Sequence, residues 1–178
     1  GVQTCALPIY LERLLYLLTG KDDAKIREWF GKLSSEGKYE VSDDIKTLLK
    51  EDFYGGCCDD EQTKETIKKT YEKYSYTLDT HTAVAVKVYE DYKSATGDET
   101  RTIIASTASP YKFSASVLEA IDGKKPEIDE FAMVDRLYEI SQYEIPDALA
   151  SLKNKEIRFS ESVESNQMKD FVLKTLGM

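Results

Sequence analysis

Apolar side chains recur at helical spacing along most of the chain, which predicts a helix-rich protein. In residues 10–18, four leucines fall at positions i, i+3, i+4 and i+7, so they share one face of a helix. Glycines follow several such segments and predict where they end, because glycine adopts the left-handed conformation that closes a helix. The pattern predicts helices over 10–18, from Asp22 or Asp23 to Gly37, from Ser42 through Leu49, from Asp59 through Tyr74, from Asp79 to Gly97, from Ser109 to Gly123, and over 130–140, 146–152 and 168–176.

Short apolar runs between these helices predict strands. Residues 103–105 form a run typical of a strand that is covered on both faces. The stretch 79–88 is ambiguous, because its valines alternate as in a strand, whereas its length and the stop at Gly97 favour a helix. We therefore expect an α/β fold that is rich in helix. Extended segments are also expected at 38–41, at 52–58, where Gly55 and Gly56 interrupt a strand, and at 156–159.

Charge and cysteine content narrow the function classes. The net charge is −9, and an acidic chain without a basic cluster disfavours nucleic acid and anionic membranes as partners. No apolar run approaches the roughly 20 residues that span a bilayer, so we expect a cytoplasmic protein. Cys5 and the adjacent pair Cys57 and Cys58 lack the spacing of a metal site, and His81 is the only histidine. We therefore expect neither a metal nor a disulfide framework.

The first nine residues, GVQTCALPI, look like the translation of a sequencing-adapter oligonucleotide joined in frame to a gene. We therefore treat residues 1–9 as a non-native segment and residues 10–178 as the protein. The chain also lacks an initiator methionine. We expect that it begins inside a helix and is the C-terminal part of something longer.

Residues 101–121 are the strongest candidate for chemistry, because a predicted strand, a polar turn and a capped helix follow one another there. Ser106 and Thr107 place two hydroxyl groups where the strand would end. Ser109 is a good N-cap, and Pro110 suits the first helical position. In open α/β sheets, ligands bind beyond the carboxyl ends of strands, near helix N-termini. The alternative is an ordinary turn in which the hydroxyls only cap the helix.

Three stretches in this order resemble the C-terminal part of threonine synthase: LERLLYLLTG at 11–20, DTHTAVAV at 79–86 and STASPYKF at 106–113. The resemblance continues in the helix start DDEQTKETI and covers nearly all of the chain from Tyr10. It implies a fold type II enzyme of the tryptophan synthase β-like group, with a three-layer αβα sheet that is incomplete in this chain. It also implies the cofactor pyridoxal 5′-phosphate (PLP) and the conversion of O-phospho-L-homoserine and water to L-threonine and phosphate, a carbon–oxygen lyase reaction in threonine biosynthesis.

The resemblance assigns roles to individual residues. In this fold type a Ser or Thr hydroxyl meets the ring nitrogen of the cofactor, and the matching residue is Thr107, with Ser106 as the alternative. Lys112 and His81 are candidates to contact the substrate; the alternatives are that Lys112 is a surface cation and that His81 is a hydrogen-bonding partner in packing. Lys112 is not expected to be the lysine that binds the cofactor covalently, because the family carries that lysine upstream in a Ser-Phe-Lys-Asp type segment. We therefore expect no catalytic residue in this chain, and no activity from it alone. Many relatives have a histidine in place of Ser109.

Two alternatives remain open at this point. The chain could be a self-contained acidic helical module that binds another protein, in which case the 106–113 turn serves only as a cap. It could also belong to another enzyme of the same fold type, because such enzymes share the arrangement of strand, hydroxyl and helix. For the parent enzyme we expect a monomer or a homodimer with a small-molecule substrate, and no nucleic-acid or membrane partner.

Overall fold

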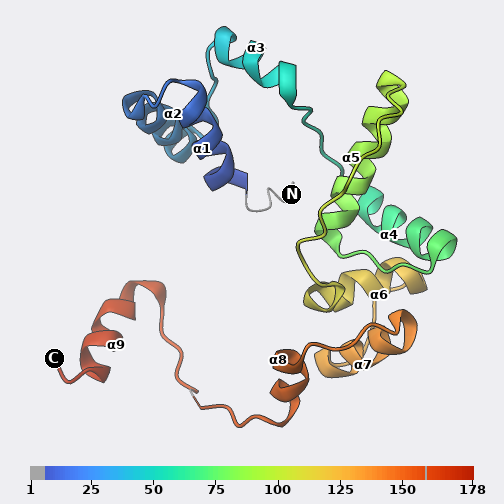
Figure 1. Cartoon of the computed structure of the whole chain (residues 1–178). Helices are drawn as coiled ribbons and strands as arrows, with labels where there is room; N and C mark the ends of the chain where they lie inside the picture. Colours follow the sequence, from blue (N-terminus) through green and yellow to red (C-terminus); the bar gives the residue numbers. More distant parts are fainter. Residues whose placement is uncertain (1–6, 159) are drawn as a thin grey trace. The chain divides into compact units, whose positions relative to one another are not determined.

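The computed structural model describes residues 7–158 and 160–178, and every regular element in those ranges is a helix (Figure 1). The chain divides into two compact units, Gly1–Tyr143 and Glu144–Met178. The first unit holds α1 (Leu7–Leu18), α2 (Asp23–Glu36), α3 (Asp43–Asp52), α4 (Asp60–Tyr74), α5 (Thr80–Thr96), the 3₁₀ turn η1 (Pro110–Phe113), α6 (Ser114–Asp122) and α7 (Glu130–Ser141); the second holds α8 (Asp147–Ala150), η2 (Ser151–Asn154), η3 (Ser165–Gln167) and α9 (Met168–Thr175).

Side-chain caps explain where the helices begin. Asp22, Asp79 and Asp129 each accept hydrogen bonds from two backbone amides of α2, α5 and α7, respectively. Asp59 and Gln62 form a reciprocal capping box at α4, as predicted. Ser42 lies at the N-cap of α3, but its side chain makes no capping bond. The predicted glycine stops are confirmed, because α2, α5 and α6 each end at a glycine with positive φ.

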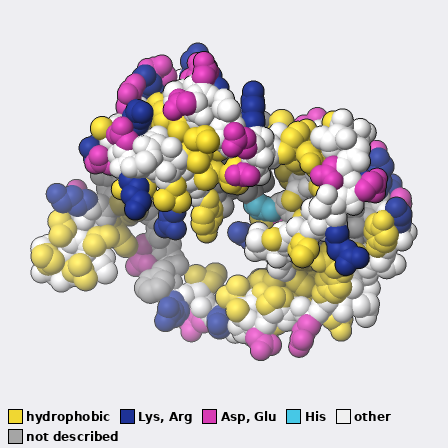
Figure 2. All heavy atoms as spheres, turned by 45° about the horizontal axis from the view of Figure 1, so that its top comes forward, with side chains coloured by type: hydrophobic (Ala, Val, Ile, Leu, Met, Phe, Trp, Pro, Cys, Tyr) yellow, Lys and Arg dark blue, Asp and Glu magenta, His cyan; other side chains and the backbone are white. Residues whose placement is uncertain are grey.

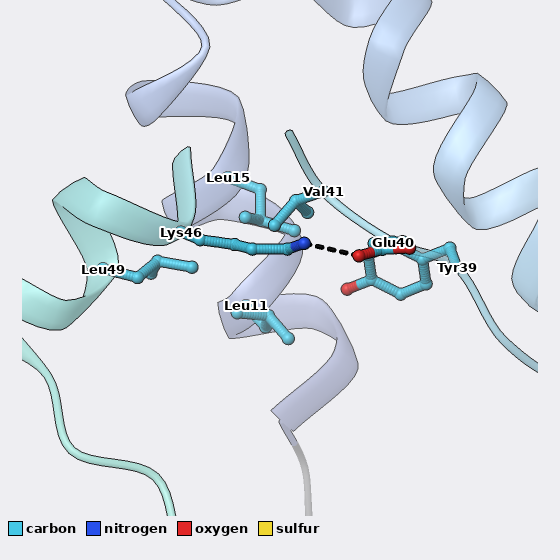
Figure 3. A pocket seen from close by; sticks show the side chains of 7 residues that line it. All are labelled: Leu11, Leu15, Tyr39, Glu40, Val41, Lys46 and Leu49. Carbon is cyan, nitrogen blue, oxygen red and sulfur yellow. Dashed lines mark hydrogen bonds and ion pairs between the residues drawn. The ribbon is translucent and has the colours of Figure 1, made fainter. Parts of the chain in front are cut away.

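Helices α1, α2 and α3 share a small hydrophobic cluster built on Leu15, Ile26, Trp29 and Ile45. The ring of Tyr39, from the connection between α2 and α3, stacks on Trp29 with 6.4 Å between ring centroids. A shallow groove of about 300 Å³ runs beside this cluster, and Figure 3 shows the side chains that line it. The lining residues are Leu11, Leu15, Tyr39, Glu40, Val41, Lys46 and Leu49.

Helices α4, α5, α6 and α7 form a second bundle, in which α4 packs on both α5 and α6 and α6 packs on α7. Its core side chains are fully buried and come from all four helices. Lys64 on α4 also forms an ion pair with Glu119 on α6, at 2.9 Å between Nζ and Oε1. That contact raises the pKa of Lys64. The most buried apolar residues are Ile67, Ala83, Val117, Leu118 and Leu137.

The connection before α4 lies directly on α5. The ring of Tyr54 meets that of Tyr92 edge-on, with 5.0 Å between centroids. Gly56 lies so close to α5 that a Cβ at this position would be 2.7 Å from Cγ1 of Val88. Real Cβ atoms essentially never come that close. Glycine at position 56 therefore lets the backbone reach the helix.

The predicted strands are wrong. Residues 103–105 form no strand, and Ile103 is 92% exposed rather than covered on both faces. The segments 38–41 and 52–58 and residues 156–158 are likewise outside any strand, whereas Phe159 lies outside the described residues. A strand needs a hydrogen-bonding partner strand, and the described residues contain none. The prediction of a helix rather than a strand for 79–97 is confirmed, since α5 occupies that stretch.

The second unit consists of short helices with little buried surface. Its helices match the predicted ones at 146–152 and 168–176, and no described side chain in them is buried. The apolar stripe of α9 is exposed, so its docking onto the rest of the chain stays a prediction. No described helix is both long and apolar enough to cross a membrane. Figure 2 shows hydrophobic side chains on the surface. The exposed apolar stripe of α9 consists of Met168, Phe171, Val172 and Leu176.

Two isoleucines give a matched test of the core and of the corrected strand. Ile67→Ala removes a fully buried side chain and should lower the free energy of unfolding by about 2–5 kcal/mol. Ile103→Ala removes a side chain that is already 92% exposed and should change it by less than about 0.5 kcal/mol. Urea denaturation of both variants measures the difference. A large loss for Ile103→Ala would show that residue 103 packs against something.

Thr77 gives a second test, because its buried Oγ1 has no hydrogen-bond partner among the described residues. An unpaired buried hydroxyl is unfavourable, so Thr77→Val should raise the free energy of unfolding by about 1 kcal/mol. Thr66→Val is the matched control, since Thr66 is also buried but donates to the Gln62 carbonyl at 2.7 Å. That variant should lose stability. If Thr77→Val is the more damaging of the two, Thr77 has a partner such as an ordered water.

Candidate functional site

The candidate site lies where the N-terminus of α5 meets the turn at residues 106–113. Asp79 is only 1% exposed and caps α5: its Oδ1 accepts from the amides of His81 at 2.8 Å and Thr82 at 3.2 Å. The sequence predicts this cap, because aspartate is a preferred N-cap residue. The buried carboxylate is thus held in place by the backbone of the helix that it caps.

The other oxygen of Asp79 connects α5 to the turn. Thr82 Oγ1 donates a short hydrogen bond to Asp79 Oδ2, and it also lies 3.0 Å from Ser106 Oγ. Ser106 Oγ in turn donates to Asp79 Oδ2 at 3.4 Å. We call these three side chains, Asp79, Thr82 and Ser106, the carboxylate triangle. A carboxylate only accepts hydrogen bonds, so the hydroxyl protons of Thr82 and Ser106 are both directed at Asp79 Oδ2.

Thr107 differs from Ser106 in the use of its hydroxyl. Both residues are exposed, but only the Ser106 hydroxyl belongs to the carboxylate triangle. The hydroxyl of Ser106 donates to Asp79, whereas no hydrogen bond among the described residues uses the hydroxyl of Thr107.

The far side of the turn is fixed by η1. Ser109 caps it by accepting from the Tyr111 amide at 3.3 Å, so the predicted cap is confirmed, although it begins a 3₁₀ turn before α6. Tyr111 is 5% exposed, and its hydroxyl donates to the Tyr143 carbonyl just after α7. Burial raises the pKa of Tyr111. The turn is thereby anchored to α7.

His81 and Lys112 come together around one aromatic ring. The imidazole of His81 packs on Phe113, with 4.9 Å between ring centroids, and Lys112 Nζ lies 5.4 Å from the same ring. His81 Nδ1 is 3.4 Å from Thr80 Oγ1 and 3.6 Å from Asp79 Oδ1. The structure therefore groups the histidine and the exposed lysine around the ring of Phe113.

Sequence reasoning missed part of the site. It treated Asp79 only as a cap and gave no role to Thr82 or Phe113. Asp79 and Ser106 lie 27 positions apart, and no local pattern predicts contact over that separation. The described ranges contain no group of three or more His, Cys, Asp or Glu side chains that could hold a metal ion, and the expectation of no metal site stays a prediction.

Comparison with known proteins shows to which family the chain belongs. A family model described as threonine synthase, C-terminal, matches residues 82–172, which include most of α5 and the whole turn. The chain belongs to the threonine synthase C-terminal family. The resemblance inferred from the sequence is therefore confirmed, and the alternative of an unrelated helical module loses its support.

Individual threonine synthases are similar over most of the chain. The enzyme from Methylobacillus glycogenes is 36% identical over 118 residues, which are 65% of this chain and 24% of that protein. The enzyme from Saccharomyces cerevisiae is 36% identical over 126 residues, 63% of this chain and 24% of that protein. This chain thus spans about a quarter of the length of these relatives.

Solved structures show the same relationship. A crystal structure of threonine synthase from yeast matches 94% of this chain and 34% of its own, at 29% identity and a TM-score of 0.65. The structure of PLP-bound threonine synthase from Brucella melitensis matches 75% of this chain and 27% of its own, at 27% identity and a TM-score of 0.51. The all-helical arrangement therefore corresponds to part of a larger PLP enzyme.

The anchor at Tyr111 predicts a pH-dependent change in stability. Tyr111→Phe removes the bond to the Tyr143 carbonyl and should lower the free energy of unfolding at pH 7 by about 1 kcal/mol. The raised pKa means that the phenol ionises first in the unfolded state, so its contribution falls as the pH rises above about 10. The gap between wild type and variant should therefore narrow there.

Urea denaturation at pH 7 and at about pH 10.5 measures this gap, and Tyr138→Phe, an exposed tyrosine on α7, controls for the loss of a phenol. A gap that stays constant or widens at alkaline pH would contradict the role given to Tyr111.

Proposed function

We propose that this chain is the C-terminal part of a threonine synthase catalytic domain, and that the whole protein converts O-phospho-L-homoserine and water to L-threonine and phosphate. The family match over residues 82–172 supports this proposal. The relatives named above are threonine synthases, and one of them is described with PLP bound. The acidic helical module without catalytic activity explains none of these matches.

The observation that carries the proposal is the hydroxyl of Thr107, which no hydrogen bond among the described residues uses, next to the hydroxyl of Ser106, which donates to Asp79. PLP supplies an electron sink that stabilises negative charge next to the bound amino group. In our proposal Thr107 donates to the ring nitrogen of PLP. A neutral hydroxyl does not keep that nitrogen protonated as an ionised carboxylate would, and so it moderates the sink.

Two nitrogen-bearing side chains, Lys112 and His81, suit the phosphate of the substrate as hydrogen-bond donors. Lys112 is exposed, and His81 lies against the shared ring of Phe113. Both side chains can turn a donor towards an anion, and His81 Nδ1 lies 3.6 Å from Asp79 Oδ1. We propose that these two side chains orient the phosphate ester, whereas the lysine that binds PLP covalently belongs to the part of the domain that this chain does not span.

The decisive experiment recovers the coding sequence upstream of Tyr10 from the source DNA and expresses the whole protein. With PLP, that protein should release phosphate from O-phospho-L-homoserine, and the 178-residue chain alone should not. Phosphate release and threonine formation are measured together. If the whole protein binds PLP but leaves this substrate unchanged, the enzyme is of the same fold type with another substrate.

Thr107 is tested in the same assay. Thr107→Asp should change the ratio of threonine to side products, because a carboxylate would keep a proton on the ring nitrogen. Thr107→Ser is the matched control, since it retains the hydroxyl and should retain the ratio. An unchanged ratio in Thr107→Asp would remove Thr107 from the cofactor site.

A further inference from the structure

The carboxylate triangle links two segments that carry different parts of the site. Asp79 belongs to the start of α5, and Ser106 belongs to the turn that presents Thr107. We infer that Asp79 is the positioning residue of this turn: through Ser106 it holds the Thr107 hydroxyl at the place where the cofactor ring binds. This inference rests on the proposed function, because it gives Asp79 a role towards the same cofactor.

Asp79 is suited to this role because it cannot move easily. Its side chain is fully buried, and its Oδ1 is held by two backbone amides of α5. The first turn of α5 is itself part of the bundle, since Thr82 is 4% exposed and Ala83 is 0% exposed. The carboxylate therefore holds Ser106, to which it is hydrogen-bonded, in a fixed position relative to the bundle.

The turn is held on both sides of Thr107. Ser106 is tied to Asp79 and Thr82, and Ser109 is fixed by the cap of η1, with Tyr111 buried behind it. Only Thr107 and Ala108 lie between these two anchors. A span this short has few conformations when both ends are fixed, so each anchor limits where the Thr107 hydroxyl can point.

The geometry also shows that Asp79 acts through other residues and not on the cofactor directly. Both of its oxygens already accept hydrogen bonds, from two amides and two hydroxyls. With 0% of its side chain exposed, no face of the carboxylate is open to a ligand. Asp79 is a positioning residue, and Thr107 is the group that contacts the cofactor.

The first test measures backbone order in the 178-residue chain by NMR relaxation. In the wild type, the amide order parameter of Thr107 should be about 0.85, as in rigid backbone. Ser106→Ala should lower it below about 0.6, and Ser106→Thr, which keeps the hydroxyl, should restore it. Asp79→Ser should have the same effect, because serine can still cap α5 but is too short to reach Ser106.

Asp129→Ser is the matched control. Asp129 caps the N-terminus of α7 in the same way, by accepting from the amides of Phe131 and Ala132, and no hydrogen bond among the described residues joins it directly to the turn, which is anchored beyond the other end of α7 at Tyr143. This variant should leave the amide order parameter of Thr107 unchanged. In the double variant of Asp79→Ser and Ser106→Ala, that order parameter should be no lower than in either single variant. A wild-type order parameter already below about 0.6, or no change in Ser106→Ala, overturns the inference.

The second test uses the whole protein and titrates it with PLP. Ser106→Ala and Asp79→Ser should each weaken PLP binding about tenfold, and Asp129→Ser should not. If the wild type binds no PLP, the proposed function fails, and the NMR result alone reports on the turn. If the variants loosen Thr107 but bind PLP as tightly as the wild type, Asp79 has no role towards the cofactor, and the inference fails while the proposed function stands.

Discussion

One buried negative charge determines how the site is built. The Asp79 carboxylate is removed from water, which is costly unless donors replace the lost hydration. The amides of His81 and Thr82 and the hydroxyls of Thr82 and Ser106 supply those donors. The helix start and the distant turn are therefore not independent features, because the same carboxylate needs both of them. Removing either partner would leave part of a buried charge without a hydrogen bond.

The bundle of α4, α5, α6 and α7 provides the fixed frame around this charge. Buried side chains from each helix pack together, and both α5 and α6 pack on α4. The anchor of Tyr111 on the end of α7 completes the frame on the other side of the turn. The hydroxyls, His81 and Lys112 thus lie on short segments that are fixed by packed helices, which is the usual way in which precise sites are held.

Local features could be predicted from the sequence, and contacts between distant residues could not. The helices at 10–18, 79–97 and 130–140 follow from periodicity and from caps such as Asp79 and Gly97, because those signals act within a few residues. The run at 103–105 has the composition of a strand, but a strand forms only with a partner, and the described residues offer none. Thr107 and Ser106 were singled out because two hydroxyls follow the apolar run and precede a capped helix, and only their expected role towards the cofactor came from the resemblance. Their different use of the hydroxyl proton depends on Asp79, which lies 27 positions from Ser106.

The close approach of the chain to α5 at Gly56 also has an evolutionary consequence. A side chain at position 56 would collide with Val88, and valine is branched at Cβ, so it cannot rotate far enough to make room. The two positions therefore cannot vary independently. Among relatives that keep this path of the chain, a larger residue at 56 should occur together with a smaller one at 88. Such a pairing would have a geometric origin, separate from any selection on catalysis.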